Sequence, residues 1–425
     1  MSKVFSQARR TFCALSAALM LSGAAVAAEV PEGTVIDASN LDAMKANTFE
    51  GKAIGSMLPP VVEMQIRKYN MRMELARSKP VPLDPKFSAA TEKNRGKVSY
   101  DAKARKVVGW EAGLPFPDVD PTDPEAGIKL MWNYFYGTPI GLNQDWPLFA
   151  YALVNAESGI ERVQHWAFQR YYMKGRFSDK NGQISQGDGN VLFKSIIVAK
   201  YPFDLKGTGV FSIRYDNDGY EDSWVYLRSV RRTRKTSGGS WMDPIGATDQ
   251  LNDDLEIFNA HPNWYRNYKV VGKRWVLAVA NSKWPVWNEN EKDYVKQFPG
   301  IDMSVKPTWN LANRYEPREV LVIEATPPEE HPYSKKIIYM EPKINRMYYC
   351  EAYDKKGELW KFMNFATRPM KGDDGSDTVA TSIGSIVDMQ RNHATVFMTG
   401  TQGHTNVDVG PDHISLGLLE KIGGN

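Results

Sequence analysis

The chain has 425 residues, of which 42% are hydrophobic and 12% aromatic, so it can bury a large core. It contains 53 Lys and Arg against 50 Asp and Glu, and three of the positive charges lie in the first 28 residues, which hold no acidic residue. The rest of the chain is therefore neutral, which argues against nucleic acid or another acidic polymer as its main partner.

The N-terminus has the features of an export signal. Lys3 and the pair Arg9–Arg10 precede an apolar run that ends in small residues. We expect cleavage near Ala27 or Ala28, so that residues 1–28 are removed and the protein lies in the periplasm. A membrane anchor is the alternative reading, but this apolar run is short for a membrane span, and no later segment reaches the roughly 18 apolar residues that a span needs. The twin arginines leave the export route open between general secretion and the twin-arginine pathway.

Residues 29–139 are predicted to form a helical and extended segment that packs on the rest of the protein. Apolar residues at helical spacing predict a helix from Val61 to Leu75, after the Pro59-Pro60 pair. Residues Lys97–Trp110 are predicted to form a hairpin. A short helix is expected over Gly127–Tyr136.

From residue 140 to the C-terminus the pattern is that of short strands separated by tight turns, such as Asp216-Asn217-Asp218-Gly219. Successive strands with hairpin turns predict an antiparallel sheet in a mainly β (α+β) domain, since nothing indicates alternating βαβ units. Two helices are expected, at Asp249–Phe258 and near Gly384–Gln390. The expected strands are Arg162–Phe177, Val191–Ala199, Gly209–Tyr215, Trp224–Val230, Trp275–Ala280, Glu319–Ala325, Lys335–Met340, Arg346–Tyr353 and Leu359–Phe365.

Cysteine usage excludes a disulfide framework. Cys13 lies in the export signal, and Cys350 is then the single cysteine. Because Cys350 lies in a predicted strand, we interpret it as a buried small side chain and not as a nucleophile.

Several short motifs carry a resemblance to a known family. They include Tyr201-Pro202-Phe203-Asp204, Ser240-Trp241-Met242-Asp243, Asp253-Asp254-Leu255 and, nearer the N-terminus, Gly113-Leu114-Pro115-Phe116-Pro117. The chain resembles domain-of-unknown-function family 1329, an uncharacterised group of outer-membrane-lipoprotein-sorting-like proteins that are similar in fold to the LolA/LolB lipoprotein carriers. Pro244 departs from the sorting-type pattern and removes a backbone N–H there.

The resemblance implies a curved antiparallel sheet bent into a half-open barrel, with helices over one face and a hydrophobic cavity between them. It also implies a periplasmic carrier of a lipid or other hydrophobic compound, working beside an outer-membrane barrel or an inner-membrane transporter. Alternating patterns suggest apolar side chains for the cavity wall, although ordinary core packing is the alternative for each. The candidate wall residues are Phe211, Ile213, Tyr215, Trp224, Tyr226, Ile338, Tyr348, Trp360 and Phe362.

A run of basic residues follows one predicted strand, at Arg228, Arg231, Arg232 and Arg234. We expect either a solvated hairpin or a basic rim that makes peripheral contact with anionic lipid headgroups.

Catalytic chemistry has little support in the sequence. The six histidines are dispersed, with none at the spacing that ligates zinc on a helix, so no metal and no cofactor are expected. No nucleophile motif or phosphate-binding loop stands in the required context. We therefore expect no catalytic residues and a carrier that is not an enzyme. The alternatives are a non-catalytic adaptor of an envelope transport complex and a periplasmic enzyme acting on a hydrophobic substrate.

Overall fold

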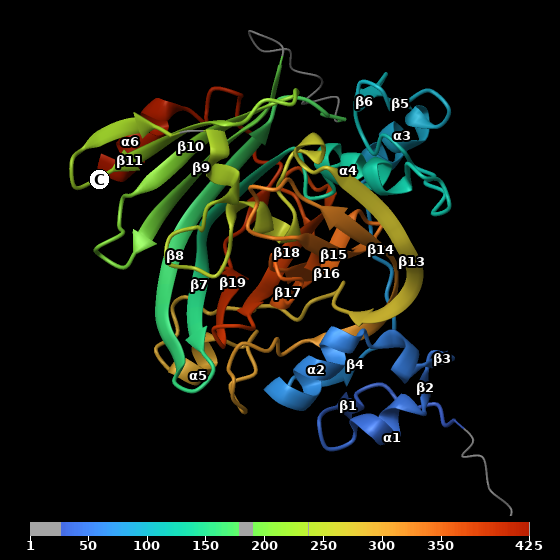
Figure 1. The fold of residues 1–425 in the computed structure, drawn as a ribbon. Coiled ribbons are helices and arrows are strands. Elements are labelled where there is room, and N and C mark those ends of the chain that lie inside the picture. The colour runs from blue at the N-terminus through green and yellow to red at the C-terminus, as the bar shows by residue number, and fades with distance from the viewer. Residues whose placement is uncertain (1–26, 178–189, 237, 425) are drawn as a thin grey trace, which may run out of the picture.

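The computed structural model describes residues 27–177, 190–236 and 238–424. Within these residues, sixteen strands join one sheet, which Figure 1 shows as a curved wall around the middle of the molecule. The strands are β1 (Val35–Ile36), β4 (Met73–Leu75), β7 (Asn143–Asn155), β8 (Gly159–Tyr172), β9 (Val191–Tyr201), β10 (Gly209–Tyr215), β11 (Asp222–Leu227), β12 (Arg232–Lys235), β13 (Asn267–Ala278), β14 (Arg314–Thr326), β15 (Lys335–Glu341), β16 (Arg346–Tyr353), β17 (Leu359–Lys371), β18 (Asp377–Asp388), β19 (His393–Thr399) and β20 (His404–Thr405).

The sheet is antiparallel along its main path and does not close. Its order runs β13, β14, β15, β16, β17, β18, β19, β7, β8, β9, β10, β11, β12, and no pairing joins β12 to β13 in the described parts of the chain. The parallel pair is β14 with β4, near Arg314. This confirms the expected mainly β fold with an unclosed, largely antiparallel sheet.

Helices and short strands pack around this sheet. Figure 1 places α1, α2 and β1–β4 together at one end, and α3, β5 and β6 at another corner. The helices are α1 (Leu41–Lys45), α2 (Pro60–Tyr69), α3 (Pro85–Asn94), α4 (Ala126–Tyr136), α5 (Tyr294–Gln297) and α6 (Leu416–Gly424). The 3-10 turns are η1 (Ile54–Met57), η2 (Gly238–Met242), η3 (Asn252–Ile257) and η4 (Pro262–Trp264), and two small hairpins pair β2 (Thr48–Phe49) with β3 (Lys52–Ala53) and β5 (Ser99–Asp101) with β6 (Lys106–Val108).

The N-terminal segment contains the predicted elements, with one boundary corrected. The hairpin and the short helix are confirmed as β5–β6 and α4. The first long helix ends at Tyr69, because Asn70 adopts a left-handed conformation with φ 53°. The following residues pair as β4 with β1, so the predicted continuation to Leu75 was wrong. Strands β1 and β4 join the main sheet, so the sheet contains residues from both sides of the predicted boundary at residue 140. The division of the chain at that residue stays a prediction.

Both helices predicted in the second half are corrected. Residues Asp249–Phe258 contain the 3-10 turn η3, in which Leu255 is extended and Glu256 has φ 49°. Gly384 lies in β18, which pairs with β17 and β19. The strands predicted between residues 162 and 365 are all present, two of them with the predicted ends and the others with changed ends. Strands β7, β12, β18, β19 and β20 were not predicted.

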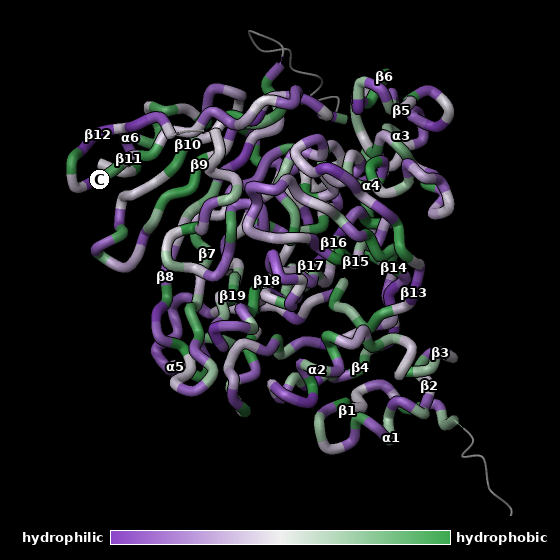
Figure 2. Tube along the Cα trace, in the orientation of Figure 1, coloured by the Kyte–Doolittle hydropathy of each residue, from purple (hydrophilic) through white to green (hydrophobic). Residues whose placement is uncertain are grey.

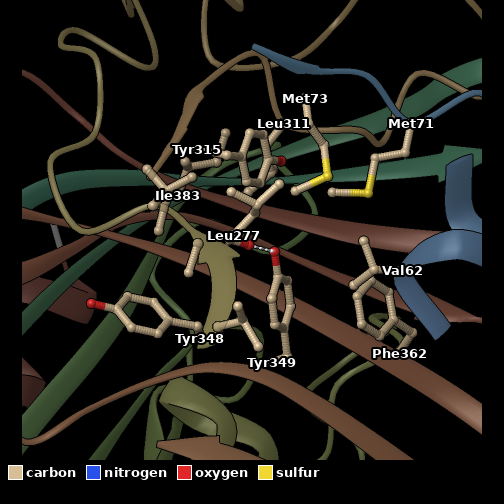
Figure 3. Close-up of a cluster of buried hydrophobic side chains, with 14 of the residues drawn as sticks. Val62, Met71, Met73, Leu277, Leu311, Tyr315, Tyr348, Tyr349, Phe362 and Ile383 are labelled. Carbon is tan, nitrogen blue, oxygen red and sulfur yellow. Dashed lines mark hydrogen bonds between the residues drawn. The ribbon is translucent and has the colours of Figure 1, made fainter. Parts of the chain in front are cut away.

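The largest apolar core lies between one part of the sheet and the N-terminal segment. Figure 3 shows Val62, Met71 and Met73 from the N-terminal segment in one apolar cluster with Tyr349 and Phe362 from the sheet, with Val62 beside Phe362. The Tyr349 hydroxyl donates to the Leu277 carbonyl over 2.5 Å. This cluster ties the N-terminal segment to β13, β16 and β17.

The C-terminal helix α6 covers the outer face of β9–β11. Leu419 of α6 is fully buried and shares an apolar cluster with Phe211 and Tyr226. A Cβ at Gly209 would lie 2.7 Å from Leu419, so glycine permits this close approach. One face of these strands is therefore covered by α6, and in Figure 2 hydrophilic and hydrophobic residues follow one another along this part of the trace.

Candidate ligand-binding cavity

The concave face of β7–β11 encloses a cavity of about 560 Å³. Its roof is formed by α4 and by the segment of residues 238–264, which crosses above the sheet. The volume lies within the range of about 300–1,000 Å³ that is usual for small-molecule sites.

The floor of the cavity contains one row of apolar side chains that runs across five strands. The cross-strand partners in antiparallel pairs point to the same face of a sheet, so residues in register form a continuous row. This apolar row consists of Trp146, Phe168, Ile197, Val210 and Val225.

A second row lies beside the first and is displaced from it by two residues on each strand. Every member of this row is polar. The hydroxyl oxygens of Ser212 and Ser223 lie 2.8 Å apart and share a hydrogen bond. This polar row consists of Gln144, Arg170, Ser195, Ser212 and Ser223. The floor therefore changes from apolar to polar over a strand rise of two residues, about 7 Å.

The wall beyond the polar row is built around Arg214. Its guanidinium forms an ion pair with Glu221, donates to the Asn259 carbonyl over 2.6 Å and lies 5.2 Å from the Phe193 ring. Burial lowers the pKa of Arg214. His261 packs nearby, and burial lowers its pKa to about 3, so this imidazole is neutral.

The roof segment is held down by a buried polar network. Nζ of Lys336 on β15 lies 2.9 Å from Asp253 Oδ2 and 2.9 Å from Asp254 Oδ1, and all three side chains are fully buried. Tyr265 donates to Asp253 over 2.6 Å, and Tyr333 donates to Asp254 over 2.7 Å. The pKa of Asp253 is lowered because the Lys336 charge outweighs the opposing effect of burial.

A second anchor joins the same roof segment to β19. The Asp249 carboxylate lies 2.7 Å from His393 Nδ1 and accepts from the Thr395 hydroxyl over 2.9 Å. Lys361 donates to the Asp249 carbonyl over 2.5 Å. The hydrogen bond to Asp249 raises the pKa of His393. Two anchors, at residues 249 and 253–254, therefore fix the roof over the cavity.

The nine candidate wall residues lie outside the described lining of this cavity. On β10 and β11 the predicted residues occupy the opposite face, where α6 covers them. Phe211 stacks on Trp224, with ring centroids 5.5 Å apart. The predicted wall residues that belong to that cluster are Phe211, Ile213, Tyr215, Trp224 and Tyr226.

The other four candidates belong to the packed interior of β15–β17. Figure 3 shows Tyr348 and Phe362 within the core that faces the N-terminal segment. Ile338 and Trp360 pack in the cluster on the other side of those strands. The prediction favoured the more apolar face of each strand, and here that face is core.

The predicted basic rim divides between two positions. Arg232 and Arg234 lie on β12 opposite Leu227 and Val225, so they extend the cavity face of the sheet toward its free edge, where both are exposed. Arg228 and Arg231 lie at the turn before β12.

The sequence contains a signal for the cavity that went unused. Along β8 every second residue from Arg162 to Tyr172 lines the cavity, and this set mixes arginine, glutamine and aromatic side chains. A strand face with this composition is too aromatic for a solvent-exposed surface and too polar for an ordinary core. Such a mixture is typical of a ligand site.

No group of three or more metal-ligating side chains occurs within the described residues. No helix there is long and apolar enough to span a membrane. Residues 1–26 of the expected export signal lie outside the part of the chain that the structure describes.

Fold and site together define a half-open antiparallel β-barrel that holds a roofed cavity with an apolar and a polar row. The chain belongs to the DUF1329 family, a family of proteins of unknown function, which it matches over residues 35–414. This confirms the family resemblance expected from the sequence motifs.

Individual relatives are distant. An uncharacterized protein of Pseudomonas aeruginosa is 24% identical over 340 residues, covering 77% of this chain and 67% of that protein. A crystal structure of a DUF1329 family protein from Desulfovibrio piger covers 70% of this chain and 100% of its own, at 20% identity and a TM-score of 0.46. A crystal structure described as an outer membrane lipoprotein-sorting protein domain, from Vibrio parahaemolyticus, has the same coverage at 16% identity and a TM-score of 0.47.

Proposed function

We propose that this protein is a periplasmic carrier that holds a lipid or another hydrophobic molecule in the cavity between β7–β11 and the roof segment. The observation that carries the proposal is the apolar row of Trp146, Phe168, Ile197, Val210 and Val225, which lines the cavity on five adjacent strands. Enclosing about 300 Å² of ligand apolar surface contributes roughly 7 kcal/mol before the cost of association is subtracted.

A non-catalytic role is part of the proposal. Three of the four arginines lining the cavity are paired with carboxylates, so these groups are positioned to balance charge. Export features at the N-terminus support the periplasmic location. As a carrier the protein would exchange its cargo with an outer-membrane barrel or an inner-membrane transporter, and the rim arginines Arg232 and Arg234 would favour brief contact with anionic lipid.

The test is native mass spectrometry of the mature protein, purified from the periplasm without detergent, followed by solvent extraction. We expect a hydrophobic adduct on the wild type that is lost from Val210→Trp, because the larger ring fills the cavity. The matched control is Val271→Trp on β13, at a side chain that is 49% exposed. An empty wild type that also fails to bind the neutral dye N-phenyl-1-naphthylamine would overturn the carrier proposal and favour the adaptor.

A further inference from the structure

We propose that the cargo is an amphiphile with a single anionic head group, held by Arg170 at the polar row, with its alkyl chain along the apolar row. This inference rests on the proposed function and adds the chemical class of the ligand. It follows from the surroundings of Arg170, from the charge balance of the cavity and from the arrangement of the two rows.

Arg170 projects from β8 into the cavity between Gln144 of β7 and Ser195 of β9, its cross-strand neighbours. Its guanidinium lies 4.3 Å from the Phe193 ring centroid and 5.1 Å from the Phe168 ring centroid. The Nε atom is buried and has no hydrogen-bond partner within the described chain. A buried donor without a partner destabilises the protein, and an anionic oxygen in the cavity would supply that partner.

The charge balance singles out the same residue. Arg162 is paired with Asp204 at 2.7 Å, Arg346 with Glu256 at 3.3 Å, and Arg214 with Glu221. Arg170 forms no ion pair with a described residue, so four arginines face three carboxylates in the described lining. The cavity therefore carries one uncompensated positive charge, which one anionic group on a ligand would neutralise.

The two rows give the ligand its orientation. Gln144 and Ser195 flank Arg170 with further hydrogen-bonding groups, which suit the several acceptor sites of a carboxylate. Phe168, two residues along β8 from Arg170, belongs to the apolar row and begins the path for an alkyl chain. A neutral hydrophobic molecule would use the apolar row but would leave Arg170 without a partner.

The experiment compares dodecanoate with dodecan-1-ol, which differ in charge at one end, by calorimetric titration of the delipidated mature protein at about pH 8, where the carboxylate is ionised. We expect the wild type to bind dodecanoate at least about tenfold more tightly than the alcohol, since a hydrogen bond to a charged group is worth about that much. Arg170→Gln should abolish this preference and leave alcohol binding unchanged. The matched control is Arg266→Gln, which breaks the exposed ion pair with Glu329 at 3.2 Å outside the described lining of the cavity.

Should Arg170→Gln fail to fold, Arg170→Lys is the second variant, because it keeps the charge but loses the planar two-point geometry. It should weaken dodecanoate binding several-fold and leave the alcohol unaffected. Equal wild-type affinity for both ligands would overturn the anionic head group, as would loss of the preference in Arg266→Gln to the same extent. Failure of the wild type to bind either ligand would instead count against the proposed carrier function.

Discussion

Because the two faces of β10 have different surroundings, we expect opposite effects from substitutions at two adjacent residues of this strand. Phe211 points toward α6 and is 5% exposed, whereas Val210 points into the cavity. We predict that Phe211→Ala lowers the free energy of unfolding and spares ligand binding. Val210→Trp should abolish ligand binding and leave the free energy of unfolding nearly unchanged.

The magnitude for Phe211 follows from its packing. The ring is buried, stacks on Trp224 at an interplanar angle of 28° and shares its cluster with Leu419 of α6. Truncating a buried phenylalanine costs about 3–5 kcal/mol, which combines lost transfer energy with the cavity left behind. Val210 borders open volume, so the added ring of Val210→Trp has room and should change the free energy of unfolding by less than about 1 kcal/mol.

Two assays separate the effects. Urea unfolding followed by circular dichroism reports the free energy of unfolding, and fluorescence titration with N-phenyl-1-naphthylamine reports binding per folded molecule. The reasoning would be refuted if Phe211→Ala kept the wild-type unfolding midpoint while weakening dye binding about tenfold or more, for that result would place the cavity on the α6 side of the strand.

Two further predictions concern the anchors of the roof segment. Lys336→Met should destabilise the protein by about 3–5 kcal/mol in urea unfolding, because it removes the cation nearest to two buried carboxylates. The control Lys273→Met breaks the exposed pair with Glu319 at 3.1 Å and should cost less than about 1 kcal/mol. Equal losses in the two variants would contradict the buried network. The pKa of His393 is raised in the folded protein by its hydrogen bond to Asp249, so its stabilisation is present below the unfolded-state pKa of about 6.5 and is lost as the pH rises through the higher folded value. His393→Gln should therefore lower the melting temperature more at about pH 5.5 than at about pH 9, and a pH-independent difference would exclude this linkage.

The local sequence pattern determined most, but not all, of the strands in the second half of the chain. Gly209–Tyr215 and Arg346–Tyr353 were predicted with the bounds that the structure has, because alternation and turn residues act over a few neighbours. The helix α4 was also predicted, with a start one residue later than the observed Ala126. The β4 strand was absorbed into a predicted helix, since Met73 and Leu75 fit either period.

Only the tertiary structure decided which face of each strand borders the cavity. Alternation showed that Phe211 and Ser212 point in opposite directions, but a helix at residues 416–424, about 200 positions away, turned the more apolar face into core. The polar row likewise depends on the register of five strands, which brings Arg170 beside Gln144 and Ser195. Register and coverage arise from long-range pairing, whereas a sequence pattern reports the local alternation of a strand and not what its two faces meet.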